Sequence, residues 1–335
     1  MTYSTLKGNI TSKIKNNLRG VMVAILIGLS AAFLGNYYAA PVMLFALLLG
    51  LSFNFLSHDS QYSAGLNFSA TSLLKIGVAL LGSRISFNDL ELLGWQPLAM
   101  VFFMVVFVIL LGVVSARIFK IDSPVGLLTA GAVAICGASA AAALVAVLSH
   151  RIKNNQIIAC TIIGVTSLSS ISMILYPIIS DMFHLSDRQA GFFIGSTIHD
   201  VAQVIGAGYS ISEESGDVAT ITKLFRVFLL VPIVFTIAII YRKKDDSQGL
   251  KLPIPGFLVI FAILMLANSF KLLSPSITEI LGDLSRWFLV FAIAAVGTQT
   301  RLKDLAGVGK AAMLLIVGET VILFVIGLST ALILL

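Results

Sequence analysis

The stretch GSTIHDVAQVIGAG, residues 195 to 208, places a histidine, an aspartate, a glutamine and three glycines inside an otherwise apolar segment. A charged group at the centre of a bilayer costs at least about 2.5 kcal/mol on insertion scales, so ionisable residues there usually mark a functional pathway. His199 and Asp200 are sequence neighbours and point to different sides of a helix, so one can face a cavity while the other is held by a partner. The alternative is a structural role in which Asp200 pairs with a basic residue and fixes a bend.

The composition around this stretch is that of an integral membrane protein. Of 335 residues, 58% are apolar and 11% are charged, whereas charged residues make up about a quarter of a typical soluble protein. The formal charge of +6 comes from Lys and Arg residues spread over short loops. That distribution is typical of the positive-inside rule and argues against a nucleic-acid-binding face.

The sequence predicts an all-α polytopic membrane protein, a single integral membrane domain over residues 1–335. Apolar runs of about 18 or more residues recur, and each can cross a hydrocarbon core of roughly 30 Å as a helix. We expect about 10 to 11 hydrophobic segments from this pattern. They lie at approximately 20–36, 41–56, 64–82, 95–118, 124–148, 156–179, 189–211, 218–241, 255–270, 285–300 and 308–335.

Loop charges predict the topology of these segments. Basic residues before the first segment place the N-terminus in the cytoplasm. Segment 124–148 has basic loops at both ends, and segment 189–211 has acidic loops at both ends. These two segments therefore either re-enter the membrane from opposite faces or cross it as broken helices.

Two short stretches predict an inverted repeat with halves at approximately 20–179 and 189–335. LLGSRISFNDL (80–90) and AVGTQTRLKDL (295–305) both follow an apolar span with glycine, hydroxyl residues, arginine and then Asp-Leu. The charge-based topology places the first outside the membrane and the second inside. Opposite orientation of similar stretches is the pattern of an inverted-topology repeat, although a match this short can arise by chance.

The stretch AVAICGASAAAALVA (132–146) is a second apolar run with an interruption, at Gly137 and Ser139. An unwound backbone in lipid leaves amide groups unsatisfied, so it must line a cavity or be buried in protein. Broken helices that face one another turn N–H groups toward a common point near the midplane, which suits an anion. Close helix packing is the alternative explanation for these small residues.

Several other polar residues fall inside predicted spans. Lys223 and Arg226 are three residues apart and share one face of a helix, where they can attract an anion, pair with Asp200, or reach the interface by snorkelling. Lys75 and Glu319 can be ion-paired with each other or with Asp200, or Glu319 can carry a coupling proton. Thr298, next to a glycine, is a candidate for lining the cavity.

Enzyme signatures are absent from the sequence. It contains no GxSxG elbow, no HExxH, no P-loop and no Cys/His spacing for zinc. Ser196, His199 and Asp200 are triad residue types, but adjacency in sequence does not give triad geometry. We therefore expect no enzyme, no metal and no cofactor other than a coupling proton or sodium ion.

Five stretches of this chain resemble the YeiH-type family of bacterial inner-membrane proteins, described as sulfate exporters. They are GVALLGSRIS, AICGASA, GSTIHDVAQVIGAG, TKLFRV and VGTQTRL, in that order, and Ala138 and Thr197 are small departures within them. The family is similar to the superfamily of sodium/proton antiporters and bile-acid symporters. The resemblance implies inverted repeats, crossing broken helices, a core moving against a scaffold and a homodimer, so we favour broken crossings over re-entrant hairpins.

Together these observations predict a secondary transporter of a small anion, with sulfate or an organosulfur acid as the expected substrate. The alternative is a cation/proton antiporter on the same fold with Asp200 as the ion ligand. Candidate substrate-binding residues are Gly137, Ala138, Ser139, Ser196, Thr197, His199, Lys223, Arg226 and Thr298. Candidate coupling residues are His199, Asp200, Glu319 and Lys75.

Overall fold

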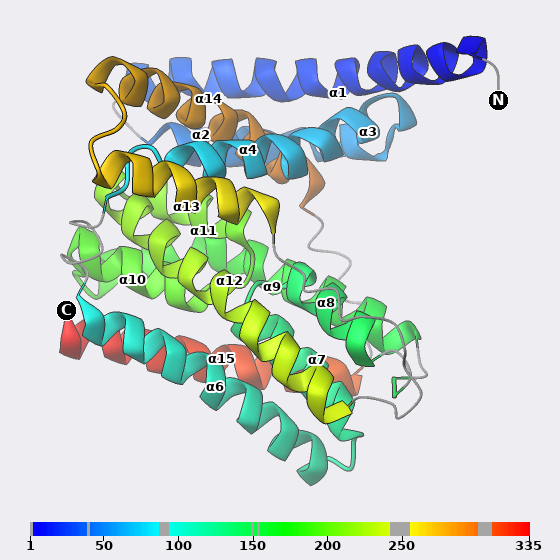
Figure 1. Ribbon diagram of the computed structural model, residues 1–335, viewed down its shortest axis with the longest axis vertical. Helices are drawn as coiled ribbons and strands as arrows, with labels where there is room; N and C mark the ends of the chain where they lie inside the picture. Colours follow the sequence, from blue (N-terminus) through cyan, green and yellow to red (C-terminus); the bar gives the residue numbers. More distant parts are fainter. Residues whose placement is uncertain are drawn as a thin grey trace. The chain divides into compact units, whose positions relative to one another are not determined.

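The computed structural model describes residues 3–38, 41–86, 94–148, 151–152, 155–241, 255–300 and 310–335, and within these ranges its regular structure is entirely helical (Figure 1). The first elements are α1 (Tyr3–Tyr38), α2 (Val42–Ser52), the 3₁₀ helix η1 (Asn54–His58), α3 (Ser60–Phe68), the π-helical turn η2 (Ser69–Leu73) and α4 (Leu74–Leu81). They are followed by α6 (Trp95–Ile118), α7 (Ser123–Ala134), α8 (Ala138–Leu148), α9 (Asn155–Met182), α10 (Asp187–Thr197) and α11 (Val201–Tyr209). The last are α12 (Glu213–Tyr241), α13 (Gly256–Ser269), α14 (Pro275–Gln299) and α15 (Lys310–Leu334).

Seven helices in the described part of the chain are long and apolar enough to cross a membrane. They lie at Asn17–Tyr38, Ser60–Leu81, Trp95–Ile118, Ile157–Met182, Glu213–Tyr241, Pro275–Gln299 and Ala312–Leu334. The remaining predicted segments form shorter helices, because a turn or break divides or ends them.

The span predicted at 285–300 begins ten residues earlier than expected. The Ser274 hydroxyl caps the N-terminus of α14 by accepting from the Ile277 N–H, and Pro275 occupies the first turn. Pro fits there because the first N–H groups of a helix have no intrahelical partner. The charged residues of the first turns lowered the local hydropathy and hid this start from the sequence pattern.

The chain divides into two compact units. Unit 1 comprises residues 1–88 and 259–301, and unit 2 comprises residues 89–258 and 302–335. In unit 1 glycines allow backbones to approach, as small residues do in membrane helix pairs. A Cβ on Gly65 would lie 2.7 Å from the Cα of Gly20 on α1, and one on Gly297 would lie 3.0 Å from the Cα of Gly50 on α2. Unit 1 therefore packs α1 on α3 and α2 on α14.

Unit 2 contains both predicted interruptions. Its core is a continuous set of buried apolar side chains contributed by α6 to α9, α12 and α15. Three aromatic rings join further helices: Tyr176 of α9 stacks on Phe193 of α10 with centroids 5.0 Å apart, and Phe324 of α15 lies 5.3 Å from Tyr176 and 5.5 Å from Phe193. These contacts fix α10 against α9 and α15.

Helices α10 and α11 fold back on one another as a hairpin, because both arms pack against the same half of α12. A Cβ on Gly191, near the start of α10, would lie 2.6 Å from the Ser215 carbonyl oxygen. A Cβ on Gly208, near the end of α11, would lie 3.2 Å from the same oxygen. The start of α10 and the end of α11 thus lie beside the same turn of α12. The connection between α10 and α11 lies beside a later part of α12.

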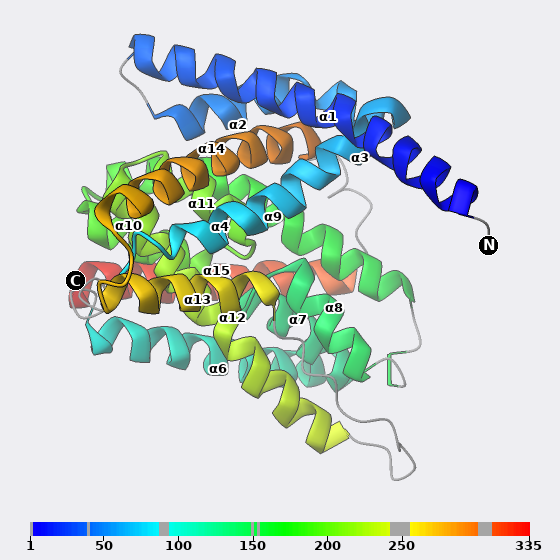
Figure 2. The same ribbon diagram turned by 45° about the horizontal axis from the view of Figure 1, so that its top comes forward.

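Helices α7 and α8 also lie side by side, as Figures 1 and 2 show. A Cβ on Gly131 in α7 would collide with the Leu144 side chain in α8. Gly131 precedes the interruption and Leu144 follows it, so the second arm returns along the first. Of the repeat-like stretches 80–90 and 295–305, residues 87–90 and 301–305 lie outside the described residues.

Candidate functional site

The two interruptions meet in unit 2. We call this region the break junction and define it as residues 135–140 and 196–203 with Lys223 and Arg226. Gly137 adopts φ +61°, a left-handed conformation that glycine accepts without a Cβ penalty. A Cβ at this position would overlap the Asp200 carboxylate and lie 2.8 Å from its Cγ. Gly137 therefore permits the turn after α7, and its missing side chain leaves the space that the Asp200 carboxylate occupies.

Two buried cations bind the carbonyl ends of both interrupted helices. The Lys223 Nζ donates to the carbonyl oxygens of Ile135 at 2.7 Å and Ile198 at 2.9 Å. Cations at helix C-termini are favourable because the last carbonyls have no intrahelical donors and carry the negative end of the helix dipole. Lys223 is fully buried, so snorkelling to the interface, one of the three alternatives for this side chain, does not occur.

Arg226 makes the more extensive set of these bonds. Its Nε donates to the Ala134 carbonyl at 2.8 Å, and its Nη2 donates to the Val133 carbonyl at 2.8 Å. Its Nη1 reaches the other break, with the Ile198 carbonyl at 3.0 Å and the Gly195 carbonyl at 3.3 Å. The fixed fork of guanidinium donors suits this bridging role better than the point charge of a lysine.

The Asp200 side chain crosses from one break to the other. Its carboxylate accepts hydrogen bonds from the Ala138 N–H at the start of α8 and from the Thr166 hydroxyl on α9. Its own N–H donates to the Ser169 Oγ at 3.0 Å. A carboxylate at a helix N-terminus is stabilised by the free N–H groups and the helix dipole. Asp200 thus caps the helix of the neighbouring hairpin.

His199 is fully buried and held at both ring nitrogens. Its Nδ1 lies 3.1 Å from the Val133 carbonyl oxygen and its Nε2 lies 3.0 Å from the Thr320 Oγ1 on α15. A carbonyl only accepts, so Nδ1 carries a proton and donates it to the Val133 carbonyl. The Thr320 hydroxyl beside Nε2 also lies 2.7 Å from the Ile316 carbonyl oxygen, to which it donates. His199 and Asp200 therefore have different environments, with His199 enclosed and Asp200 partly exposed.

The accessible part of the break junction is formed by the starts of α8 and α11. Ser139 is exposed, and Ala138, Asp200 and Val201 are partly exposed. First-turn N–H groups have no partner within their own helix. The Ser196 and Thr197 side chains are buried instead, and both hydroxyls donate to the Phe193 carbonyl one turn back.

Three predicted site residues lie elsewhere. Lys75 is exposed on α4 of unit 1, and Thr298 is buried in the same unit with its hydroxyl donating to the Ala295 carbonyl at 2.7 Å. Glu319 is buried on α15 of unit 2, where its Oε1 lies 3.0 Å from the Thr129 hydroxyl. Lys75 and Thr298 thus belong to unit 1, whereas Glu319 and the break junction belong to unit 2.

Hydroxyl groups that the sequence pattern did not single out surround the ionisable residues. They are Thr129, Thr166, Ser169 and Thr320. The run GVTSLSSIS (164–172) in an otherwise apolar helix was the available signal for two of them. Among the described residues, no group of three His, Cys, Asp or Glu side chains is placed to hold a metal ion.

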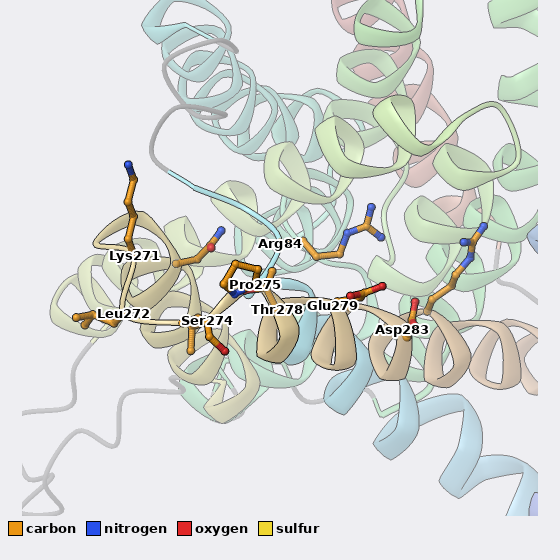
Figure 3. A pocket seen from close by; sticks show the side chains of 12 residues that line it. Arg84, Lys271, Leu272, Ser274, Pro275, Thr278, Glu279 and Asp283 are labelled. Atoms are coloured by element: carbon orange, nitrogen blue, oxygen red, sulfur yellow. The ribbon is translucent and has the colours of Figure 1, made fainter.

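A cavity of about 940 Å³ opens in unit 1 and is lined by residues of that unit (Figure 3). It is bordered by the end of α13, the first turns of α14 and Arg84. Arg84 extends along the part of α14 that carries Glu279 and Asp283 (Figure 3). The cavity is thus lined by both basic and acidic side chains, at the end of α13 and the start of α14.

Comparison with known proteins identifies the family. The family described as "Conserved hypothetical protein 698" matches residues 19–316. A UPF0324 membrane protein of Chlorobaculum tepidum is 43% identical, covering 93% of this chain and 88% of that protein. The UPF0324 membrane protein TauZ of Paracoccus denitrificans is 46% identical, covering 91% and 92% respectively.

A further UPF0324 membrane protein, from Rhizobium meliloti, is 41% identical over 90% of this chain and 87% of its own length. No solved structure matches. The apolar helices and these relatives agree on a multi-pass membrane protein, and the resemblance to the YeiH-type family is confirmed. The chain belongs to the UPF0324 family of membrane proteins.

Proposed function

We propose that this protein is a secondary transporter of a small anion in the bacterial inner membrane, with sulfate or an organosulfur acid as substrate. The observation that carries the proposal is the composition of the break junction. It combines two buried cations, one partly exposed carboxylate and the N-terminal turns of two helices. Transport proceeds by alternating access, without enzymatic chemistry and with the N-terminus in the cytoplasm.

Charge balance favours an anionic ligand. In their ordinary ionised forms, Lys223 and Arg226 contribute two positive charges and Asp200 contributes one negative charge. Both cations are fully buried, and buried charge without a counter-charge is costly. A bound anion would supply the missing negative charge, and its departure would restore the imbalance.

The accessible N-termini supply the ligand-binding groups. The Asp200 carboxylate accepts the hydrogen bond of the Ala138 N–H. The next first-turn N–H groups of α8 and the first-turn N–H groups of α11 have no acceptor within their own helices. With the exposed Ser139 hydroxyl, they form a set of donors at the positive ends of two helix dipoles. The anion would therefore contact backbone N–H groups. Lys223 and Arg226, which are buried and hydrogen-bonded to carbonyls, would attract it electrostatically without touching it.

We further propose that both hairpins are re-entrant, in place of the broken crossings that the resemblance implies. The four arms have 9 to 12 residues and are about 14–18 Å long at 1.5 Å per residue, which spans roughly half of a 30 Å hydrocarbon core. The basic loops around 124–148 and the acidic loops around 189–211 support entry from opposite faces.

An inverted repeat is the natural source of two such hairpins. Each hairpin precedes a long helix with an internal proline: α9 has 28 residues and Pro177, and α12 has 29 residues and Pro232. We propose that the compact units correspond to the moving core and the scaffold, and that the protein works as a homodimer, as the family resemblance implies.

The test is uptake of radiolabelled sulfate into proteoliposomes, combined with sulfate-dependent thermal stabilisation of the purified protein. Ser139→Asp places a negative charge at the exposed start of α8 and should abolish both signals. Ser139→Ala is the matched control and should retain most of them. Equal sulfate binding by both variants would refute an anion site at this helix start.

The cation/proton antiporter remains the second candidate because of Asp200. It is a partly exposed carboxylate with two hydroxyl neighbours, Thr166 and Ser169, and oxygen atoms are the ligands that hard cations prefer. Adding sodium or sulfate to weakly buffered protein separates the two functions. A cation exchanger releases protons with sodium alone, and Asp200→Asn should abolish that release.

A further inference from the structure

Glu319 is a carboxyl group enclosed between helices. It lies near the middle of α15 and is only 2% exposed. The space for it is made by Gly112 of α6, since a Cβ there would lie 2.7 Å from the Glu319 Oε1. The other carboxyl oxygen, Oε2, is buried and has no hydrogen-bond partner among the described residues.

The hydrogen-bond geometry around Glu319 fits a protonated carboxyl. The Thr129 Oγ1 lies 3.0 Å from the Glu319 Oε1 and 3.1 Å from the Gly126 carbonyl oxygen. A hydroxyl has one hydrogen and can donate fully to only one of them. If Glu319 carries a proton, its O–H donates to Thr129 and Thr129 donates to Gly126, so both distances are hydrogen bonds. If Glu319 is ionised, one of these bonds is lost.

The surroundings of Glu319 supply no counter-charge among the described residues. Helix α15 packs mainly on α6, α7, α9 and α10. Their titratable residues are Arg117 on α6, Cys160, Tyr176 and Asp181 on α9, and Asp187 and Arg188 on α10, while α7 has none. The charged residues among them do not interact electrostatically with Glu319, on which burial and the Thr129 hydrogen bond act. Arg117 turns to the Ser123 Oγ at 3.4 Å, and Asp181 and Asp187 are exposed near helix ends.

Glu319 is also connected to both hairpins. Thr129, its hydrogen-bond partner, belongs to α7 of the first hairpin, and Thr320, its neighbour on α15, contacts His199 in the second break. A movement of the hairpins along α15 would therefore separate Glu319 from Thr129 and admit water to the carboxyl group.

We propose that Glu319 is the proton-binding site that couples anion movement to the proton gradient. This inference rests on the proposed function and names its coupling ion. The carboxyl carries its proton while enclosed, gives it to water when the hairpins move, and takes one from water on the other side of the membrane. One O–H bond is broken and one is formed, so no oxidant or reductant takes part.

Glu319→Gln tests the proposal, because an amide N–H can replace the carboxyl O–H as donor to Thr129. We expect the variant to fold and to exchange radiolabelled sulfate for internal sulfate within twofold of the wild-type rate. It should lose the sulfate accumulation that an imposed proton gradient drives. Glu279→Gln, the same change at an exposed glutamate of α14, is the control and should keep both activities. Accumulation at the wild-type level in Glu319→Gln would overturn the proposal.

Infrared spectroscopy of the purified protein tests the proton on Glu319 without any transport. At neutral pH the wild type should show the C=O band of a protonated carboxylic acid, sensitive to deuterium exchange, which Glu319→Gln removes and Glu279→Gln retains. Thr129→Val should shift this band to higher frequency because the carboxyl loses its acceptor. A band that survives in Glu319→Gln, or that Thr129→Val does not shift, contradicts the inference. Wild-type vesicles that take up no sulfate would instead refute the anion proposal, whatever the infrared band shows.

Discussion

Replacing Gly137 with alanine should strongly destabilise the break junction. The left-handed conformation at φ +61° costs a non-glycine residue about 1–2 kcal/mol. The added Cβ would also overlap the Asp200 carboxylate. That carboxylate has two hydrogen bonds, from Ala138 and Thr166, and loss of one bond to a charged group costs about 1.5–3 kcal/mol. The two effects together predict a loss of roughly 2.5–5 kcal/mol in the free energy of unfolding.

The assay is equilibrium unfolding of the purified protein in detergent micelles, run as a double-mutant cycle. Gly318→Ala is the matched control, because a Cβ at that exposed helical position meets nothing within 4 Å, and it should be neutral or stabilising by up to about 1 kcal/mol. Asp200→Ala removes the overlapping group, so Gly137→Ala in that background should cost only the conformational part, about 1–2 kcal/mol. An equal cost of Gly137→Ala with and without Asp200 would refute the steric argument.

Three further substitutions test the packing of unit 2. Arg226→Met leaves the carbonyls of two helix ends without their donor and should lower stability by about 1–3 kcal/mol for each carbonyl left unsatisfied, seen as loss of monodisperse protein in fluorescence-detected size-exclusion chromatography. Gly112→Ala overpacks the contact with Glu319 and should cost about 1–3 kcal/mol in thermal unfolding, whereas Gly318→Ala should not. Thr166→Val removes a donor to Asp200 and should cost about 1–3 kcal/mol, with Thr166→Ser close to the wild type in the same unfolding experiment.

The membrane character and the positions of the interruptions were accessible from sequence. Apolar run length decides whether a helix can span a bilayer, and seven described helices meet that condition. The glycine at 137 and the adjacent ionisable residues at 199 and 200 violate the local rules for an apolar helix, and the structure breaks both helices there. Such violations are visible in sequence because they depend on neighbouring residues only.

Only the tertiary structure decided where the arms and the long side chains go. A break can lead to a crossing or to a hairpin, and the choice depends on which helix each arm packs against. Gly191 in one arm and Gly208 in the other both approach Ser215 of α12, so this break forms a hairpin. The side chains of Lys223 and Arg226 could equally have extended toward water. They turn inward because α12 brings them beside the C-terminal carbonyls of two helices, which need donors. Lys223 and Arg226 are about 90 positions away in the chain from the carbonyls of Ile135 and Ala134, so the sequence alone does not reveal that they are close.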